Sequence, residues 1–144
     1  MHLTIVPDVV KSQDVFDLPA NATALQAARH MVDRDTAAVL VLDASRHLIG
    51  IVTERDLARR VLAQGRDPAT TSLEAIMTRN PDTLSPQDSA LDALELMSVR
   101  RYRHLPVVDG DKVVGMVSIR DLYATVKARL EEDIRETEAF AFGR

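Results

Sequence analysis

Cysteine and tryptophan are both absent from this chain of 144 residues, and aromatic residues make up only 3% of it. Without cysteine the chain has no disulfide, thiolate metal site or thiol nucleophile, a usage that fits a reducing compartment and excludes a secreted disulfide scaffold. With few aromatic side chains, platforms for stacking single-stranded bases are scarce. Nucleic-acid binding is therefore a disfavoured alternative.

Long hydrophobic runs are also lacking. Residues 1–14, MHLTIVPDVVKSQD, do not show the charged and then apolar pattern of a secretory signal, and no apolar run approaches the roughly 20 residues that span a bilayer. The formal net charge of −4 argues weakly against a surface that binds nucleic acid or anionic lipid throughout. We expect a soluble, cytoplasmic protein without membrane association.

An internal repeat organises what is present. Several residues recur 66 positions later, as Leu18 does at Leu84 (84 minus 18), and after one turn the displacement falls to 65, as in Gly50 and Gly115. That turn is DASRHLIG in the first repeat and DGDKVVG in the second, which is one residue shorter. Hydrophobic residues form 46% of the chain and charged residues 28%, which is a globular composition. The chain is therefore predicted to hold two copies of one folded unit.

Each repeat shows the same order of local signals. In the first repeat, residues 21–26 carry a capping box, and a helix follows with apolar residues at helical spacing: Leu25, Ala28, Met31 and Val32. Two short β-rich runs, 38–42 and 48–52, flank a turn and predict a hairpin. Thr53 then caps a second helix, whose predicted buried stripe is Leu57, Val61 and Leu62. The equivalent elements of the second repeat are predicted at 88–100, 105–108, 113–117 and from 119 onward.

The remaining segments connect or extend the repeats. Residues 72–81 predict one short helix ended by a proline, with a counterpart near residues 6–11. Val126, Leu130 and Ile134 lie four apart and predict an amphipathic extension that packs on the module or on a second subunit. We predict the first repeat at 5–64, a linker and short helix at 65–81, the second repeat at 82–128 and a helical extension at 129–144. A repeat this short buries little surface alone, so the two are expected to pack as one module of the α/β (α+β) class.

The corner between strand and helix is the most distinctive repeated motif. Thr53 to Asp56 in GIVTERD matches Ser118 to Asp121 in GMVSIRD. On this motif alone the favoured interpretation is a capping box, in which the hydroxyl and the acid satisfy helix-start amides. The alternative is a ligand site, where free amides attract phosphate and the carboxylate accepts ribose hydroxyls. Arg55 and Arg120 stand beside the acids and are able to offset their charge or pair with phosphate.

A basic segment, Arg100 to Pro106, occurs only in the second repeat. For Arg100 and Arg101 the favoured interpretation is a solvated helix end that complements the helix dipole. Arg103 and His104 lie closer to the strand, where the first repeat has Ala37 and Ala38. If phosphate binds, the two sites are therefore not equivalent.

The paired corners and the phrase RHLPVVDGDKVVGMVSIRDL resemble a tandem pair of cystathionine β-synthase (CBS) domains, called a Bateman module, over about residues 5–130. The resemblance implies two β-α-β-β-α repeats related by a pseudo-two-fold axis, with an adenosine-containing ligand bound in clefts between them. Ligands of such modules are AMP, ADP, ATP, NAD or S-adenosylmethionine. The resemblance also implies a homodimer.

The same resemblance assigns roles to individual residues. Asp56 and Asp121 would hold ribose hydroxyls, and Thr53 and Ser118 would meet phosphate or ribose. Apolar contacts to adenine would come from Ile51 and Met116. The base edge would be read by backbone near 102–105 and 36–39, which includes Tyr102 and Ala38. Candidates for phosphate are Arg55, Arg103, His104 and Arg120.

The function expected from the sequence is a regulatory adenine-nucleotide sensor without catalytic residues or a metal, acting on an unidentified protein partner. Alternatives are an S-adenosylmethionine sensor and a ligand-free scaffold for protein interactions. An enzyme is disfavoured because the four histidines, His2, His30, His47 and His104, show no metal-binding spacing, and no P-loop or nucleophile elbow occurs.

Overall fold

The structure is a computed structural model that describes residues 2–13 and 15–142. Residue 14 of the first predicted repeat and residues 143–144 of the predicted extension lie outside the described residues. The chain divides into two compact units, which are treated separately below. The first unit contains the described parts of Asp14–Asp82 and Asp109–Val114, and the second those of Met1–Gln13, Thr83–Val108 and Gly115–Arg144.

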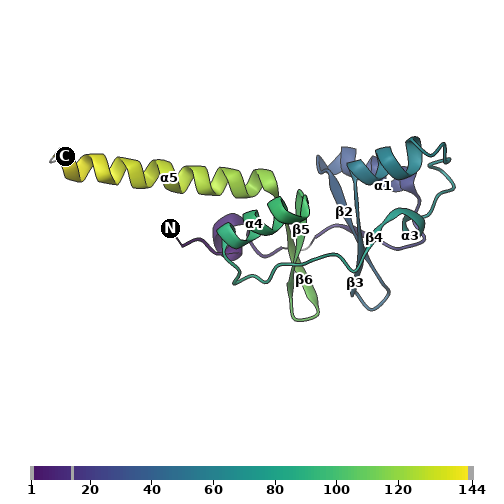
Figure 1. Cartoon of the computed structure of the whole chain (residues 1–144). Coiled ribbons are helices and arrows are strands. Elements are labelled where there is room, and N and C mark those ends of the chain that lie inside the picture. Colours follow the sequence, from purple (N-terminus) through teal and green to yellow (C-terminus); the bar gives the residue numbers. More distant parts are fainter. Residues whose placement is uncertain (1, 14, 143–144) are drawn as a thin grey trace. The chain divides into compact units, whose positions relative to one another are not determined.

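The first unit follows the predicted strand and helix order around a four-stranded sheet in the order β1-β2-β3-β4 (Figure 1). β1 runs parallel to β2, whereas the β2-β3 and β3-β4 pairs are antiparallel. The hairpin strands fall where their β-rich runs predicted them. The elements are β1 (Asp17–Leu18), α1 (Ala24–Arg34), β2 (Ala38–Leu42), β3 (Leu48–Thr53), α2 (Glu54–Asp56), η2 (Leu57–Leu62), α3 (Leu73–Ile76) and β4 (Thr78–Arg79).

The buried face of α1 is rotated by one position from the predicted stripe. Ala24, Ala27 and Met31 are buried in the core, whereas Val32 is 81% exposed. Small side chains at the first two positions allow the helix backbone to approach the sheet closely, and this sets the buried face. The stripe predicted for the next helix was wrong in the same way, because Val61 is buried but Leu62 is 71% exposed.

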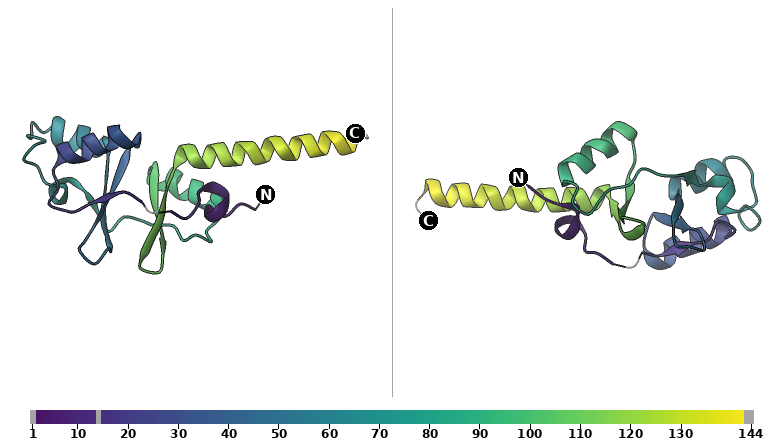
Figure 2. Two further views of the ribbon diagram at one scale, coloured as in Figure 1. Left: turned by 180° about the vertical axis from the view of Figure 1, so that it is seen from behind. Right: turned by 90° about the horizontal axis from the view of Figure 1, so that it is seen from below.

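The second unit repeats this order with a shorter first strand. Leu84 forms only a single parallel bridge with Val107, at positions equivalent to Leu18 and Val41 of the β1-β2 pair. β5 and β6 form a two-stranded sheet. α5 packs on α4 and η1 near its start and then continues well beyond both (Figures 1 and 2). The elements are η1 (Ile5–Val9), α4 (Ala90–Arg100), β5 (His104–Asp109), β6 (Lys112–Ser118) and α5 (Ile119–Ala141), although Asp109–Val114, the tip of the β5-β6 hairpin, is grouped with the first unit.

The linker contains a shorter helix than the predicted 72–81. α3 ends at Ile76 because Met77 adopts an extended conformation, with φ −71° and ψ 155°. Thr78 and Arg79 then form β4, opposite Ile51 and Gly50 of β3. The propensity of the segment for helix is overridden by an available strand edge, which offers its backbone a second set of hydrogen bonds.

The linker completes the unit of the repeat that precedes it. The amide of Ala24, the first residue of α1, donates to the carbonyl of Thr71 at 2.8 Å. In return, the amide of Leu73 donates to the carbonyl of Ala22 at 2.9 Å. Leu73 and Ile76 are fully buried in the core beside α1. The linker is therefore part of the first folded unit.

The N-terminal segment does the same for the second repeat. The amide of Ala90, the first residue of α4, donates to the carbonyl of Leu3 at 2.8 Å, and the amide of Ile5 donates to the carbonyl of Asp88 at 2.9 Å. These bonds match those of the linker in the first unit. The counterpart expected near residues 6–11 is therefore η1, which begins at Ile5.

We expect Ile5→Ala to destabilise the protein because Ile5 is fully buried in the second unit. Truncating a buried isoleucine costs about 2–4 kcal/mol of unfolding free energy. Val99→Ala, at an exposed position of α4 in the same unit, should cost less than about 0.5 kcal/mol. Urea unfolding of both variants measures the difference, and equal midpoints would contradict the placement of the N-terminal segment.

The repeated glycines of the two corner motifs are predicted to differ in their tolerance of a side chain. A Cβ on Gly50 would overlap Met77 Sδ and lie 2.9 Å from its Cγ, whereas a Cβ on Gly115 would lie no closer than 3.7 Å to any neighbour. Gly50→Ala should therefore cost about 1–3 kcal/mol, through displacement of the buried Met77. Gly115→Ala should leave the unfolding free energy within about 1 kcal/mol of the parent. Thermal and urea unfolding of the pair test this, and a larger loss for Gly115→Ala would refute it.

Candidate functional site

The first corner is a complete capping box at the end of β3. The Thr53 amide donates to Asp56 Oδ2 at 2.9 Å, and the Asp56 amide donates back to Thr53 Oγ1 at 3.2 Å. The hydroxyl of Thr53 is also 3.2 Å from the same carboxylate oxygen. Arg60 Nε lies 3.6 Å from the other oxygen, Asp56 Oδ1. The acid of the first corner is therefore already accompanied by a cation.

The second corner has the same geometry at the end of β6. The Ser118 amide donates to Asp121 Oδ2 at 2.9 Å, and the Asp121 amide donates to Ser118 Oγ at 3.1 Å. The position equivalent to Arg60 is Thr125, whose hydroxyl donates to the backbone carbonyl of Asp121 at 3.0 Å. The capping-box interpretation is thus confirmed in both corners, but the surroundings of the two acids differ.

The helix-start amides are less available than the phosphate interpretation assumed. The amide of Glu54 donates to the carbonyl of Ala37 at 3.0 Å, and the amide of Ile119 donates to the carbonyl of Arg103 at 2.8 Å. At these two positions the amides are not free, because carbonyls at the strand entrances accept from them. The acid side chains also keep acceptor capacity for a ligand, since a carboxylate that accepts one amide has further acceptor positions.

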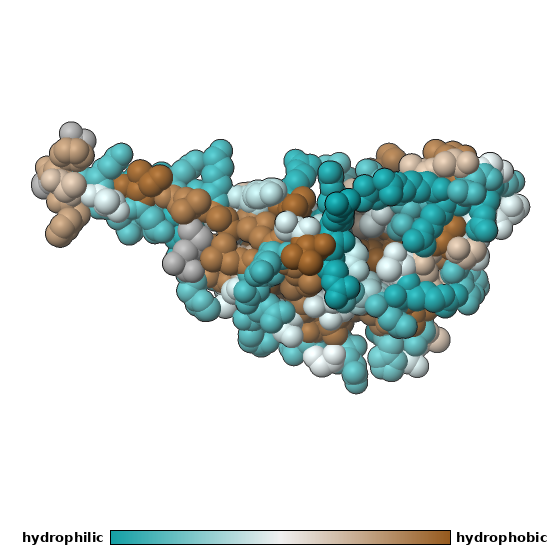
Figure 3. Space-filling view, viewed as in Figure 1, coloured by the Kyte–Doolittle hydropathy of each residue, from teal (hydrophilic) through white to brown (hydrophobic). Residues whose placement is uncertain are grey.

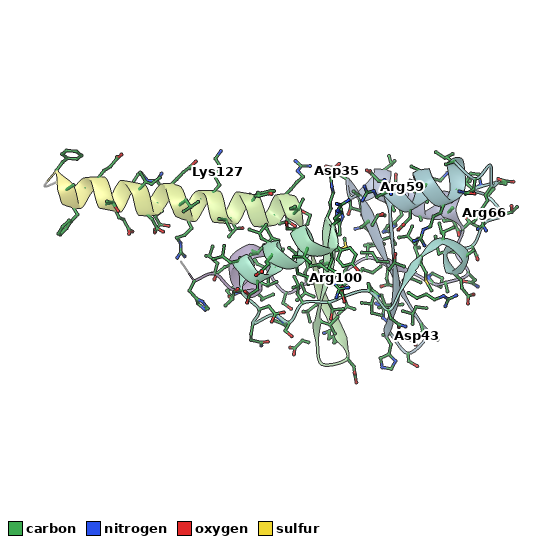
Figure 4. The ribbon with its side chains drawn as sticks, viewed as in Figure 1. Asp35, Asp43, Arg59, Arg66, Arg100 and Lys127 are labelled. Carbon is green, nitrogen blue, oxygen red and sulfur yellow. The ribbon has the colours of Figure 1, made fainter. Side chains whose placement is uncertain are left out.

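The same bonds bring the basic segment to the second corner. Because Ile119 donates to the carbonyl of Arg103, the start of β5 is fixed beside the start of α5. Arg103 is exposed and His104 is half-buried. Arg100 ends α4, where Figure 4 labels it, and Arg101 adopts a left-handed conformation with φ 61° that caps this helix.

The other predicted site residues are placed less favourably for a ligand. Ala38 pairs with Thr53 across β2 and β3 and is buried, and Ile51 is only 6% exposed, so an adenine ring reaches its side chain only if a neighbour moves. Met116 and Tyr102 are half-buried, and Arg55 and Arg120 are exposed. The structure therefore gathers Ala38, Thr53 and Asp56 in one unit, and Arg103, Ser118 and Asp121 in the other.

Sequence reasoning missed Arg60 and Thr125. Arg60 lies four residues after Asp56, a spacing that places the two side chains on the same face of a helix, so the signal was present. Its guanidinium also donates to the carbonyl of Ile76 at 3.0 Å, a tertiary contact that no local pattern indicates.

Two broader classes of site are not found in the described part of the chain. Among residues 2–13 and 15–142, no three histidine, aspartate or glutamate side chains gather so that they could hold a metal ion. No helix in these residues is both long enough and apolar enough to cross a membrane.

The family model of the CBS domain matches the chain twice, at residues 8–63 and 73–127. The chain is 33% identical to the mitochondrial CBS domain-containing protein CBSX3 of Arabidopsis thaliana, over 97% of this chain and 73% of that protein. It is also 36% identical to CBSCBSPB3 of the same plant, over 86% of this chain but only 22% of that longer protein. Other CBSCBSPB proteins are likewise covered over less than a quarter of their length.

Solved structures share the fold. A protein with CBS domains from Burkholderia ambifaria is 38% identical, with a TM-score of 0.78 over 81% of this chain and 85% of that one. The CBS domain pair of protein MJ0100, solved with 5′-methylthioadenosine and S-adenosyl-L-methionine, is 27% identical, with a TM-score of 0.74 over 82% of this chain and 92% of that one. Since both repeats match the family model and solved pairs share their fold, this chain belongs to the CBS domain family, a family of regulatory modules, and carries two CBS domains in tandem.

Proposed function

We propose that this protein is a regulatory sensor that binds an adenosine-containing ligand, with Asp121 accepting the ribose hydroxyls. The observation that carries the proposal is the second corner, where a hydroxyl, a carboxylate and a basic strand entrance are fixed together by the bond from Ile119 to Arg103. The MJ0100 pair, which was solved with two adenosine compounds, supports this class of ligand.

The two corners are proposed to bind unequally. Asp56 has Arg60 within ion-pair distance, so a ligand there competes with an existing partner. In the second corner, the position equivalent to Arg60 is occupied by Thr125. The Thr125 hydroxyl donates to a backbone carbonyl, so this residue does not offset the charge of the Asp121 carboxylate. The second corner is therefore the stronger acceptor for hydroxyl groups, because a ligand there does not compete with an arginine for the carboxylate.

The basic strand entrance favours ligands that carry phosphate. Arg103 and His104 supply donors beside the second corner, where the first repeat has Ala37 and Ala38. AMP, ADP, ATP and NAD all combine adenosine with phosphate and fit this arrangement. S-adenosylmethionine is the second candidate, because the MJ0100 pair was solved with it.

Regulation requires that the ligand bind two states of the protein with different affinities. Asp121 lies in the first turn of α5, so ligand held there acts directly on the start of that helix. The ligand is bound and released without turnover in this proposal, and an unidentified protein partner reads the change. A ligand-free scaffold is the alternative, and it would bind its partner equally with and without nucleotide.

We expect Ser118→Ala to weaken nucleotide binding at least about tenfold in calorimetric titrations with AMP, ATP, NAD and S-adenosylmethionine. Removal of the hydroxyl also removes a helix cap, at a cost of about 1 kcal/mol of stability. Ser89→Ala is the matched control, since Ser89 caps α4 in the same unit through the Asp92 amide at 3.1 Å. Its stability loss should be similar and its ligand affinity unchanged. Equal affinities for the two variants, or no binding by the folded parent, would favour the scaffold.

We expect Arg103→Ala to lower the affinity for ligands that carry phosphate more than the affinity for ligands without phosphate. The substitution should weaken the binding of AMP and ATP about tenfold, because it removes a charge-assisted donor. The affinities for adenosine and S-adenosylmethionine should stay within about twofold of those of the parent. Arg55→Ala, at an exposed arginine of the first corner, is the control and should have a smaller effect on AMP. Equal losses for adenosine and AMP would show that Arg103 does not contact phosphate.

A further inference from the structure

Arg60 is held in place by more than its ion pair with Asp56. Its Nη1 donates to the carbonyl of Ile76 at 3.0 Å and makes a longer bond, at 3.4 Å, to the carbonyl of Met77. Its Nε lies 3.6 Å from Asp56 Oδ1. One guanidinium therefore bridges the acid of the first corner and two carbonyls at the end of α3. All four residues belong to the first unit.

The two carbonyls anchor the guanidinium independently of the acid. Ile76 is the last residue of α3 and Met77 is its C-cap. Carbonyls at the end of a helix lack partners within that helix, so an arginine that donates to them satisfies groups that need an acceptor's partner elsewhere. Both residues are also buried. Withdrawal of Arg60 would take this donor away from the end of α3.

This anchor is important because the ion pair alone is weak. The Arg60 side chain is 50% exposed, and ion pairs at exposed positions contribute little, since solvent screens them and a long side chain must be ordered. Here the bonds to the α3 carbonyls already order the guanidinium beside Asp56. A ligand hydroxyl that approaches this carboxylate therefore meets a cation that moves away only if hydrogen bonds break.

The second corner has no equivalent of this anchored cation at the same position. Thr125 follows Asp121 by four residues, as Arg60 follows Asp56. Its hydroxyl donates to the backbone carbonyl of Asp121, within α5, at 3.0 Å. The amide of each cap residue, Thr53 or Ser118, donates to its acid at 2.9 Å in both corners. The capping geometry is thus shared, and the residue four positions after the acid differs.

The alternative role for Arg60 is a contact with a ligand phosphate. Arginine binds phosphate best through two neighbouring nitrogens of its planar fork. Nε already faces Asp56 and Nη1 already donates to Ile76, so either pair of neighbouring nitrogens includes one that is in use. A two-nitrogen contact with phosphate would require one of these interactions to break. The geometry therefore favours a guanidinium that occupies the acid over one that awaits a phosphate.

We propose that Arg60 is an intramolecular competitor that closes the first corner to ligand. The inference rests on the proposed function of the corners and extends it, because it assigns the closed state to one anchored side chain. It predicts that each chain binds one adenosine-containing ligand tightly, at the second corner. It also links the first corner to the linker, since a ligand that reached Asp56 would displace a guanidinium bonded to the end of α3.

The test is Arg60→Thr in the full-length protein, which introduces the residue type of the second corner. Calorimetric titrations with adenosine and with AMP measure affinity and stoichiometry. The parent should bind one ligand per chain. In the variant, the affinity of the first corner for both compounds should rise at least about fivefold, so that a second ligand per chain becomes measurable, because the carboxylate has lost its competitor.

Arg59→Thr is the matched control, since it removes the same charge from the neighbouring residue of η2. Arg59 is exposed. Figure 4 labels it, and Figure 3 shows hydrophilic residues at the surface in the same part of the view. This control should keep one ligand per chain, with an affinity within about twofold of the parent. Adding Thr53→Ala to Arg60→Thr should abolish the second binding event, whereas adding Ser118→Ala should not, which would assign the new event to the first corner.

Arg60→Gln is a second variant that removes the charge but keeps an amide donor for the carbonyls of α3. It should show the same gain in binding, and it replaces Arg60→Thr if circular dichroism shows that Arg60→Thr has lost the fold of the parent. The inference is overturned if the parent already binds two ligands per chain with equal affinity, or if the Arg60 and Arg59 variants behave alike. It is also overturned if Arg60→Thr weakens AMP but not adenosine, which would make Arg60 a phosphate contact.

These results leave the proposed function of the second corner intact. A different result would overturn that function and this inference together, namely that neither the folded parent nor the folded Arg60→Thr variant binds adenosine or AMP.

Discussion

The structure depends on one requirement, which is that the first amide of each helix after its cap must find an acceptor outside the helix. In all four helix starts of the two repeats, that acceptor is a backbone carbonyl of another segment. These bonds fix the linker to the first repeat, the N-terminal segment to the second repeat, and each strand entrance to its corner. The donor and acceptor pairs are Ala24 and Thr71, Glu54 and Ala37, Ala90 and Leu3, and Ile119 and Arg103.

The duplicated corner is therefore explained first by folding and only then by function. A cap that satisfies amides is needed wherever a strand leads directly into a helix, so duplication of the fold retains Thr53 with Asp56 and Ser118 with Asp121. Functional differences arise at positions that the repeats do not share. Arg60 accompanies only the first acid, and the charged strand entrance is found only in the second repeat.

The proposed ligand site lies at the start of α5. In this proposal the ligand contacts Asp121 in the first turn of the helix, which packs on α4 and η1 near its start. Further along, the helix exposes Leu130 and Ile134.

Local signals in the sequence determined the repeat, the hairpin strands and the capping boxes, because each depends on residues close together in the chain. Ser118 and Asp121, for example, were identifiable from their spacing alone. The buried face of α1, the strand β4 and the contact of Arg60 with Ile76 were decided by tertiary structure. The use of the corner amides by Ala37 and Arg103 was decided in the same way. The physical reason is that backbone groups and apolar faces choose among partners distant in sequence, and only the folded chain shows which partners are within reach.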